Sequence, residues 1–290
     1  MAKKILIILL LVFVTGGVAS YVFFHRDSLA LISPLFAGRD QTEKISKKVS
    51  QFNLDFTKAK ELSTLASVPR YIVYNSETGL VYYSKGAGLK MSPASFTKLL
   101  TAQVALDLIS LDREITVSEK AVDKVPTILG LKVGEILPAS ELLRGAIATS
   151  ANDAAQALSD GAASLTGIYP SEFIYYMNRK AELLGMTHSH FTNPDGLDDQ
   201  NQYSTLSDIA KLIHNVQKNY PDIVSAGKAD NQDIVQTATH GKYYLPNWNG
   251  LLGVYPGVDG LKIAYTEDAG YSTIVTAVRD QTGVVAIVSG

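Results

Sequence analysis

The sequence predicts an α+β domain whose antiparallel sheet is formed by both ends of the folded region. β-Rich runs at 71–74 and 80–83 enclose a polar, glycine-ended turn, a pattern typical of a hairpin. A second pair of such runs, 271–279 and 284–289, closes the chain. Between the two pairs, apolar residues recur at helical spacing. Strands at both ends with helices between them indicate a sheet flanked by helices, with a mainly helical subdomain inserted.

The first expected helix is marked by Ser92 and Pro93. Serine is a common N-cap and proline suits the first helical position, so we expect a helix that continues to Ile109. After the final strand we expect a further helix that covers the sheet. We therefore expect that the sequence ending at Gly290 is truncated. Further helices are expected over 140–148, 153–165, 170–184 and 207–217.

Residues 1–26 have the layout of an export signal. Two lysines precede an uncharged run over 5–24, so the rest of the chain is expected outside the cytoplasmic membrane. Two alternatives stay open. The small residues 18–20 suit cleavage of a signal peptide, whereas the full run would span roughly 30 Å as an uncleaved membrane anchor. Residues 27–66 are expected to form a tether and 67–290 the folded domain.

The composition excludes several classes of protein. The formal net charge is −2 and charged residues make up 19% of the chain, so no basic excess indicates nucleic-acid binding. Without cysteine, the chain has no disulfide, no thiolate zinc site and no cysteine nucleophile. His188 and His190 alternate as on a strand, but without a third ligand two surface histidines are favoured over a metal site.

Ser95 and Lys98 are the first candidates for chemistry. If Ser92 caps the helix, Ser95 lies in its first turn, where backbone N–H groups without helical partners suit an oxyanion. Lys98 shares that face, and a lysine in a dry site can lose its proton and activate the hydroxyl. The same spacing recurs at 225–228 without a helix start, so spacing alone leaves a purely capping serine as the alternative.

Two later segments add polar candidates. Ser150 and Asn152 lie between two expected helices, where a kink would turn both side chains the same way, to relay a proton and hold a peptide group. The alternative is that one of them caps the helix that starts at Asp153. Lys262 enters an edge strand and would bind an anionic terminus and lower the proton affinity of Lys98, unless it is a solvated strand-end lysine.

Taken in order, these segments resemble the D-alanyl-D-alanine carboxypeptidases, the low-molecular-mass penicillin-binding proteins. The set S-x-x-K, S-x-N and a later lysine motif is typical of that group and of the β-lactamases. The resemblance covers about residues 68–290 and implies the β-lactamase/transpeptidase-like fold. The similar blocks are 92–98, 131–135 through 150–155, 193–197 and 255–262.

The resemblance implies a serine peptidase that trims the terminal D-alanine from peptidoglycan stem peptides. Ser95 would be the acylated nucleophile and Lys98 its general base. Ser150 would pass a proton to the leaving amine, and Asn152 would position Lys98 and the substrate. β-Lactam antibiotics would act as acylating inhibitors, and no metal or organic cofactor is implied. The protein would work at the outer face of the bacterial cytoplasmic membrane.

The third motif departs from the family pattern of Lys-Thr-Gly. Lys262 would bind the substrate carboxylate, and the Tyr265 N–H would complete the oxyanion hole with the Ser95 N–H. Ile263 supplies no hydroxyl and Ala264 adds a methyl group. A missing hydrogen bond to a charged group would cost about 1.5–3 kcal/mol. Thr266 shares a strand face with the lysine and could substitute.

Two rival functions follow from these features. The first is a β-lactamase of the same fold, but the block at 193–197 resembles the peptidase form instead of a glutamate-bearing loop. The second is a non-catalytic, membrane-anchored module that binds peptidoglycan, supported by the altered third motif. The intact candidates for nucleophile, base and relay favour an enzyme over this second rival.

Overall fold

The computed structural model describes residues 40–290, and its main compact unit runs from Lys44 to Gly290. The predicted export signal and the first part of the predicted tether lie outside the described residues. Within 40–290, no helix combines the length and the apolarity needed to cross a bilayer. The choice between a cleaved signal and an anchor therefore stays a prediction.

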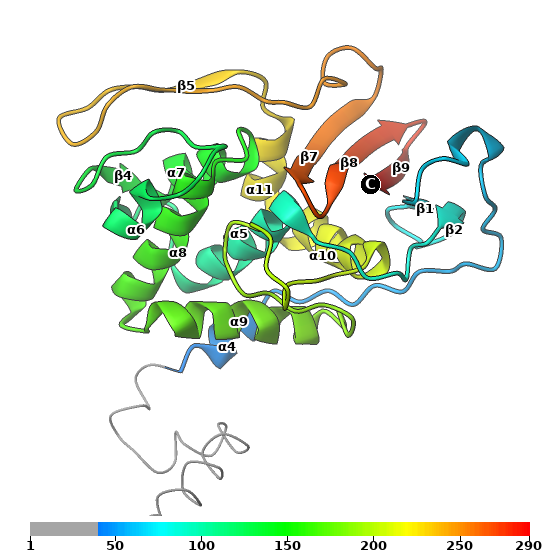
Figure 1. Ribbon diagram of the computed structural model, residues 1–290, viewed down its shortest axis with the longest axis horizontal. Helices are drawn as coiled ribbons and strands as arrows, with labels where there is room; N and C mark the ends of the chain where they lie inside the picture. Colours follow the sequence, from blue (N-terminus) through cyan, green and yellow to red (C-terminus); the bar gives the residue numbers. More distant parts are fainter. Residues whose placement is uncertain (1–39) are drawn as a thin grey trace, which may run out of the picture. The chain divides into compact units, whose positions relative to one another are not determined.

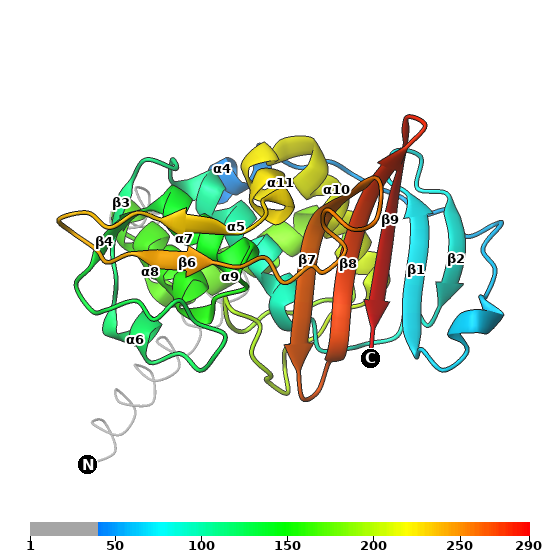
Figure 2. The same cartoon turned by 90° about the horizontal axis from the view of Figure 1, so that it is seen from above.

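A five-stranded antiparallel sheet unites the two ends of the folded region (Figure 2), as the sequence predicts. The strand order is β2-β1-β9-β8-β7, so the hairpin from the start of the domain pairs with the last strand of the chain. The edge strand β7 lies next to the helices. The strands are β1 (Arg70–Asn75), β2 (Val81–Lys85), β7 (Val258–Thr266), β8 (Gly270–Arg279) and β9 (Thr282–Ser289).

One buried row of isoleucines shows why these residues form a sheet in this register. Ile287 of β9 lies opposite Ile72 of β1 on one side and opposite Ile274 of β8 on the other. All three side chains are fully buried. Because side chains alternate between the faces of a strand, a shift by one residue would turn this row away from the core. The hydrophobic pattern therefore specifies the register that joins the chain's two ends.

The helices form the other part of the unit (Figure 1), and the five helices predicted over residues 92–217 are present. The sequence missed α11, whose first residue Pro221 has the φ angle that a helix needs at its start. The helices and 3₁₀ turns are α4 (Thr42–Ser46), η1 (Ser63–Leu65), η2 (Ala94–Phe96), α5 (Thr97–Leu108), α6 (Glu119–Val122), α7 (Ala139–Ile147), α8 (Asn152–Thr166), α9 (Pro170–Leu183), α10 (Leu206–Asn219) and α11 (Pro221–Lys228). Two small hairpins complete the unit: β3 (Glu114–Thr116) with β4 (Ile136–Pro138), and β5 (Gln232–Ile234) with β6 (Tyr243–Leu245).

Part of the predicted tether packs on the helices. Ile45 and Phe52 are buried in the main core. The Nζ atom of Lys180 on α9 donates to the carbonyl oxygen of Ile45 at 2.7 Å and to that of Lys48 at 2.8 Å. The same amine forms a buried ion pair with Asp107 of α5, also at 2.8 Å. One lysine thus joins the incoming chain to two helices, while the predicted boundary between tether and domain stays a prediction.

Replacing Lys180 by alanine should lower the free energy of unfolding by about 3–5 kcal/mol, because a buried carboxylate loses its cation. Urea-induced unfolding measures this loss. The matched control is Arg179→Ala one residue earlier, whose ion pair with Glu182 is exposed and should contribute less than about 1 kcal/mol. Equal losses for the two variants would contradict the anchoring role of Lys180.

Candidate active site

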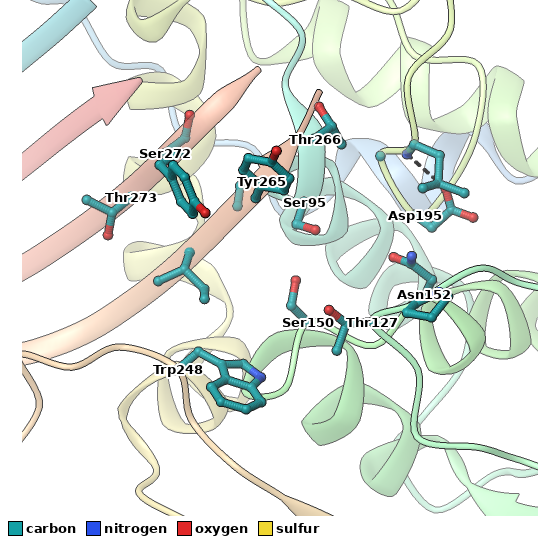
Figure 3. A pocket seen from close by; sticks show the side chains of 16 residues that line it. Ser95, Thr127, Ser150, Asn152, Asp195, Trp248, Tyr265, Thr266, Ser272 and Thr273 are labelled. Carbon is teal, nitrogen blue, oxygen red and sulfur yellow. Dashed lines mark hydrogen bonds between the residues drawn. The ribbon is translucent and has the colours of Figure 1, made fainter. Parts of the chain in front are cut away.

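A cavity of about 610 Å³ lies beside the edge strand β7, where that strand meets the inserted helices. Its walls come from the turn η2, the connection between α7 and α8, the loop 193–197 and the strands β7 and β8. Ser95, Ser150, Asn152 and Tyr265 all line it, so the structure brings four predicted site residues together. Figure 3 shows Ser95 and Ser150 facing each other across the cavity from different elements.

The side chains of Ser95 and Lys98 are in direct contact. The Nζ atom of Lys98 lies 2.9 Å from the Ser95 Oγ atom and 2.7 Å from the Asn152 Oδ1 atom. It also donates to the backbone carbonyl oxygen of Asp195. Lys98 is fully buried, so its amine has these three oxygens in place of water. A neutral amine held in this position can accept the hydroxyl proton of the serine.

The local start of this helix differs from the predicted one. Ser92 does not cap it; its hydroxyl donates to the Asp198 carboxylate at 2.8 Å instead. A hydrogen bond to a carboxylate is stronger than one to a backbone group, which explains why Ser92 bonds to Asp198 and not to the start of the helix. Pro93 is the N-cap of η2, and Ser95 lies in this 3₁₀ turn directly before α5. Lys98 still follows within one helical turn, so the predicted pairing holds although the predicted cap is wrong.

Burial sets the protonation of Lys98. It lowers the pKa of this lysine from its ordinary 10.5 to about 7, because the charged ammonium loses its hydration. The negative charge of Asp195 opposes the shift and the positive charge of Lys124 adds to it. Lys124 and Asp195 form an ion pair at 2.6 Å, so the nearest carboxylate is already neutralised. Lys98 therefore carries a substantial neutral fraction near pH 7.

Ser150 and Asn152 are held by the backbone around them, and neither of them caps α8. Ala151 is the N-cap residue of that helix, with no side-chain cap. Ser150 has a φ of +65°, an uncommon conformation that turns the chain between the two helices. The Asn152 N–H donates to the Thr127 carbonyl at 2.7 Å and its Nδ2 atom to the Val125 carbonyl at 2.8 Å. These bonds aim the Asn152 oxygen at Lys98, and the capping alternative is wrong.

Lys262 is a buried lysine in the middle of β7. Only 2% of its surface is exposed, so the alternative of a solvated strand-end lysine is wrong. Its Nζ atom donates to the carbonyl oxygen of Ile263 at 2.9 Å. Burial lowers the pKa of Lys262 well below its ordinary value, and the nearby charge of Lys98 adds to this effect. An anion that binds beside this amine would favour its charged form and raise its pKa.

The residues after Lys262 line the cavity. Ile263, Ala264, Tyr265 and Thr266 follow one another along its wall. The Tyr265 side chain is half exposed, and its hydroxyl donates to Glu267 at 3.2 Å. The Thr266 hydroxyl donates to the Asp198 carboxylate at 2.7 Å. Its proton is therefore directed at Asp198, and the substitution of Thr266 for the hydroxyl that Ile263 lacks stays a prediction.

Comparison with known proteins identifies the family of this chain. A family model described as D-alanyl-D-alanine carboxypeptidase matches residues 57–290. The chain belongs to this family. The predicted resemblance is thereby confirmed, and the family match favours the carboxypeptidase form over the β-lactamase alternative.

Individual relatives of this family member support the same family assignment. D-alanyl-D-alanine carboxypeptidase DacF of Bacillus subtilis (strain 168) is 31% identical over 224 residues, which cover 76% of this chain and 56% of the relative. The D-alanyl-D-alanine carboxypeptidase of Streptomyces sp. (strain K15) is 31% identical over 227 residues, or 74% of this chain and 78% of that protein. The chain spans about half the length of several curated relatives, at 56% of DacF and 55% of Escherichia coli DacA.

Solved structures confirm the predicted fold of this family member. A mutant of the Streptomyces K15 DD-transpeptidase has a TM-score of 0.71 at 30% identity, and the match covers 77% of this chain and 90% of that chain. The D-alanyl-D-alanine carboxypeptidase of Mycobacterium tuberculosis H37Rv has a TM-score of 0.69 at 28% identity, covering 77% and 82%.

Three acidic residues support the candidate site without having been predicted as site residues. The Asp153 carboxylate accepts three successive backbone N–H groups, at 2.9 to 3.1 Å, from the loop 129–131 beside Asn152. Asp195 supplies the carbonyl oxygen that binds Lys98. Asp198 joins the segment before the nucleophile to the end of β7. The family resemblance of the 193–197 block could have indicated Asp195, but nothing in the sequence indicates Asp198, whose partners Ser92 and Thr266 are distant along the chain.

The other candidates raised by the sequence do not form a second centre. Lys228 of the repeated S-x-x-K spacing pairs with Asp259 at 2.6 Å on the exposed helix α11. His188 contacts Thr187 through its Nδ1 atom, and the Nδ1 atom of His190 contacts the carbonyl oxygen of Asn201. Within residues 40–290, no group of three or more histidines and carboxylates lies close enough together to hold a metal ion.

Gly196 allows the loop 193–197 to approach the nucleophile turn. Its φ is +87°, and a Cβ atom there would overlap the carbonyl oxygen of Ala94. Gly196→Ala should therefore lower the free energy of unfolding by at least about 2 kcal/mol, through backbone strain and the clash together. Gly167→Ala is the matched control, because its φ is +71° but no atom lies within 4 Å. Thermal or urea unfolding measures both losses. Equal losses of unfolding free energy for the two variants would show that the close approach of Gly196 to Ala94 does not contribute to stability.

Proposed function

We propose that this protein is a serine-type D-Ala-D-Ala carboxypeptidase that trims peptidoglycan stem peptides through an acyl-enzyme on Ser95. The observation that carries the proposal is the fully buried Lys98 amine at 2.9 Å from the Ser95 hydroxyl. The family membership of residues 57–290 supports the same reaction. The protein acts at the outer face of the bacterial cytoplasmic membrane, with its N-terminal segment as signal or anchor.

The reaction begins when the Ser95 oxygen attacks the carbonyl carbon of the penultimate D-alanine and Lys98 accepts the hydroxyl proton. The developing oxyanion accepts hydrogen bonds from the N–H groups of Ser95 and Tyr265. Ser150 passes a proton to the leaving amine, so the peptide C–N bond breaks and free D-alanine departs. Asn152 holds the Lys98 amine and the substrate backbone. Water then hydrolyses the ester to regenerate the serine and release the shortened peptide.

The terminal carboxylate of the substrate binds near Lys262. Binding of the carboxylate favours the charged form of this buried lysine, because an opposite charge raises the pKa that burial and Lys98 lower. β-Lactam antibiotics, which present a carboxylate beside a reactive amide, acylate the same serine. Acylation and hydrolysis as described use side chains and backbone groups of this protein together with one water molecule.

Labelling of the purified protein with a fluorescent penicillin tests the proposal. We expect covalent labelling of the wild type and none of Ser95→Ala. Ser225→Ala removes the exposed serine of the repeated S-x-x-K spacing and should label like the wild type. A folded wild-type protein that does not label would overturn the proposal and favour a non-catalytic module that binds peptidoglycan.

The pH dependence of acylation should follow the neutral form of Lys98. A base with a pKa of about 7 gains activity as the pH rises through 7 and then reaches a plateau. Lys124→Ala removes a positive charge and frees the Asp195 carboxylate, so the midpoint should move up by about one unit. Labelling rates across the pH range measure both midpoints.

Lys120→Ala is the control for the change in net charge, because this lysine is exposed on α6. Its midpoint should equal that of the wild type. A midpoint that does not move in Lys124→Ala, or that moves equally in both variants, would assign the titration to a group other than Lys98.

A further inference from the structure

Two tyrosines form one end of the cavity, where β7 and β8 approach their connecting turn. Tyr265 of β7 lies directly opposite Tyr271 of β8 in the sheet. Their ring centroids are 4.6 Å apart at an angle of 38°, and both residues line the cavity. Tyr271 keeps 80% of its surface exposed, so a ligand in the cavity can pack on its ring. The two rings together form an aromatic surface beside the nucleophile.

This aromatic surface lies on the side of Ser95 that suits the acyl part of the substrate. In the view of Figure 3, Tyr265 lies on one side of Ser95, whereas Ser150 and then Trp248 lie on the other. Ser150 is the proposed proton donor to the leaving amine, so the leaving residue belongs on its side. The part of the peptide that stays on Ser95 as an ester therefore runs the other way, towards the turn between β7 and β8.

A carboxylate adjoins the aromatic surface at this turn. The Tyr265 hydroxyl donates to Glu267 at 3.2 Å, and the negative charge of Glu267 raises the pKa of Tyr265. Glu267 is exposed, and no lysine or arginine in the part of the chain that the structure describes forms an ion pair with it. The Asp198 carboxylate at the same turn already accepts hydrogen bonds from three groups of the protein. Glu267 therefore presents an uncompensated negative charge beside the two rings.

A carboxylate beside aromatic rings suits an ammonium group. The ring faces attract a cation through their quadrupoles, and the carboxylate adds the attraction between opposite charges. Glu267 follows Tyr265 by two residues, which places its backbone at most about 7 Å further along the chain. A lysine-like side chain has its ammonium at the end of a flexible four-carbon stem. Such a side chain, on the residue directly before the two D-alanines, is long enough to reach this carboxylate from the reacting centre.

We infer that Tyr265, Tyr271 and Glu267 form a subsite for the acyl side of the substrate, and that it selects a residue with a side-chain ammonium directly before the two D-alanines. The inference rests on the proposed function and leaves D-Ala-D-Ala as the pair that is cleaved. Because the subsite is exposed, the cation–π attraction and the ion pair are each moderate, and together they favour the ammonium by about fivefold.

Two peptides that differ in one charge test the inference. Nα-acetyl-L-Lys-D-Ala-D-Ala has a free side-chain ammonium, whereas the Nα,Nε-diacetyl peptide has none. The release of D-alanine measures kcat/KM for each peptide. We expect the wild type to favour the peptide with the free ammonium by about fivefold, and this ratio to fall as salt is added, since salt screens exposed charges. Equal values of kcat/KM, or a preference for the diacetylated peptide, would overturn the inference.

Variants compared by the same ratio test the individual residues, because a general loss of activity affects both peptides alike. Glu267→Gln keeps an acceptor for the Tyr265 hydroxyl but removes the charge, and should lower the ratio to about two. Tyr271→Ala should also lower it, whereas Tyr271→Phe keeps the ring and should retain it. Glu77→Gln is the control, because this exposed glutamate lies between β1 and β2 at the opposite edge of the sheet. A wild-type ratio in Glu267→Gln, or an equal fall in Glu77→Gln, would overturn the assignment.

Penicillin labelling separates failure of the subsite from failure of the proposed function. A protein that labels at Ser95 but hydrolyses both peptides equally well refutes the subsite alone. If the protein does not label, the enzyme is refuted and calorimetric binding of the two peptides tests the subsite. Tighter binding of the peptide with the free ammonium, weakened in Glu267→Gln, would then support it, and equal binding would refute it.

Discussion

The buried amine of Lys98 is the constraint on which the rest of the site depends. A shift of its pKa from 10.5 to about 7 corresponds to roughly 5 kcal/mol of lost preference for the charged form. An amine in such a place needs fixed hydrogen-bond partners, since water does not reach it. Its three partners belong to Ser95, Asn152 and Asp195, which lie on three different segments. The fold must bring those segments together before any chemistry is possible.

Two features of the loop 193–198 meet this demand. Gly196 lets the loop backbone touch the nucleophile turn, which places the Asp195 carbonyl at the lysine. The Asp198 carboxylate then accepts hydrogen bonds from Ser92, from Thr266 and from the N–H of Asp268. One carboxylate thus joins the segment before Ser95 to the end of β7. A loop that contains neither Ser95 nor Tyr265 therefore links the segments of the proposed nucleophile and the proposed oxyanion donor.

The sequence predicts the parts of this structure that local patterns specify. The sheet, the main helices and the pairing of Ser95 with Lys98 follow from periodicity, from turn residues and from spacing along one helix. What the sequence missed depends on partners far along the chain. Ser92 has the residue type of a cap, but the carboxylate of Asp198 is a better acceptor and comes from 106 residues away. Trp248 gave no signal, because its neighbours in the cavity arrive from other elements.

The altered third motif also has a physical interpretation. The proposed nucleophile, base and relay come from helices and their connections, and Lys98 keeps its contacts with Ser95, Asn152 and Asp195 although residues 263–264 depart from the family pattern. The strand itself is not disturbed, because β7 stays in register with β8 from Gly260 to Thr266. The added methyl group of Ala264 lies on the buried face, opposite Ser272. The substitutions therefore lie apart from the contacts of Lys98, so we expect this change of motif to affect the binding of the substrate more than the reactivity of Ser95.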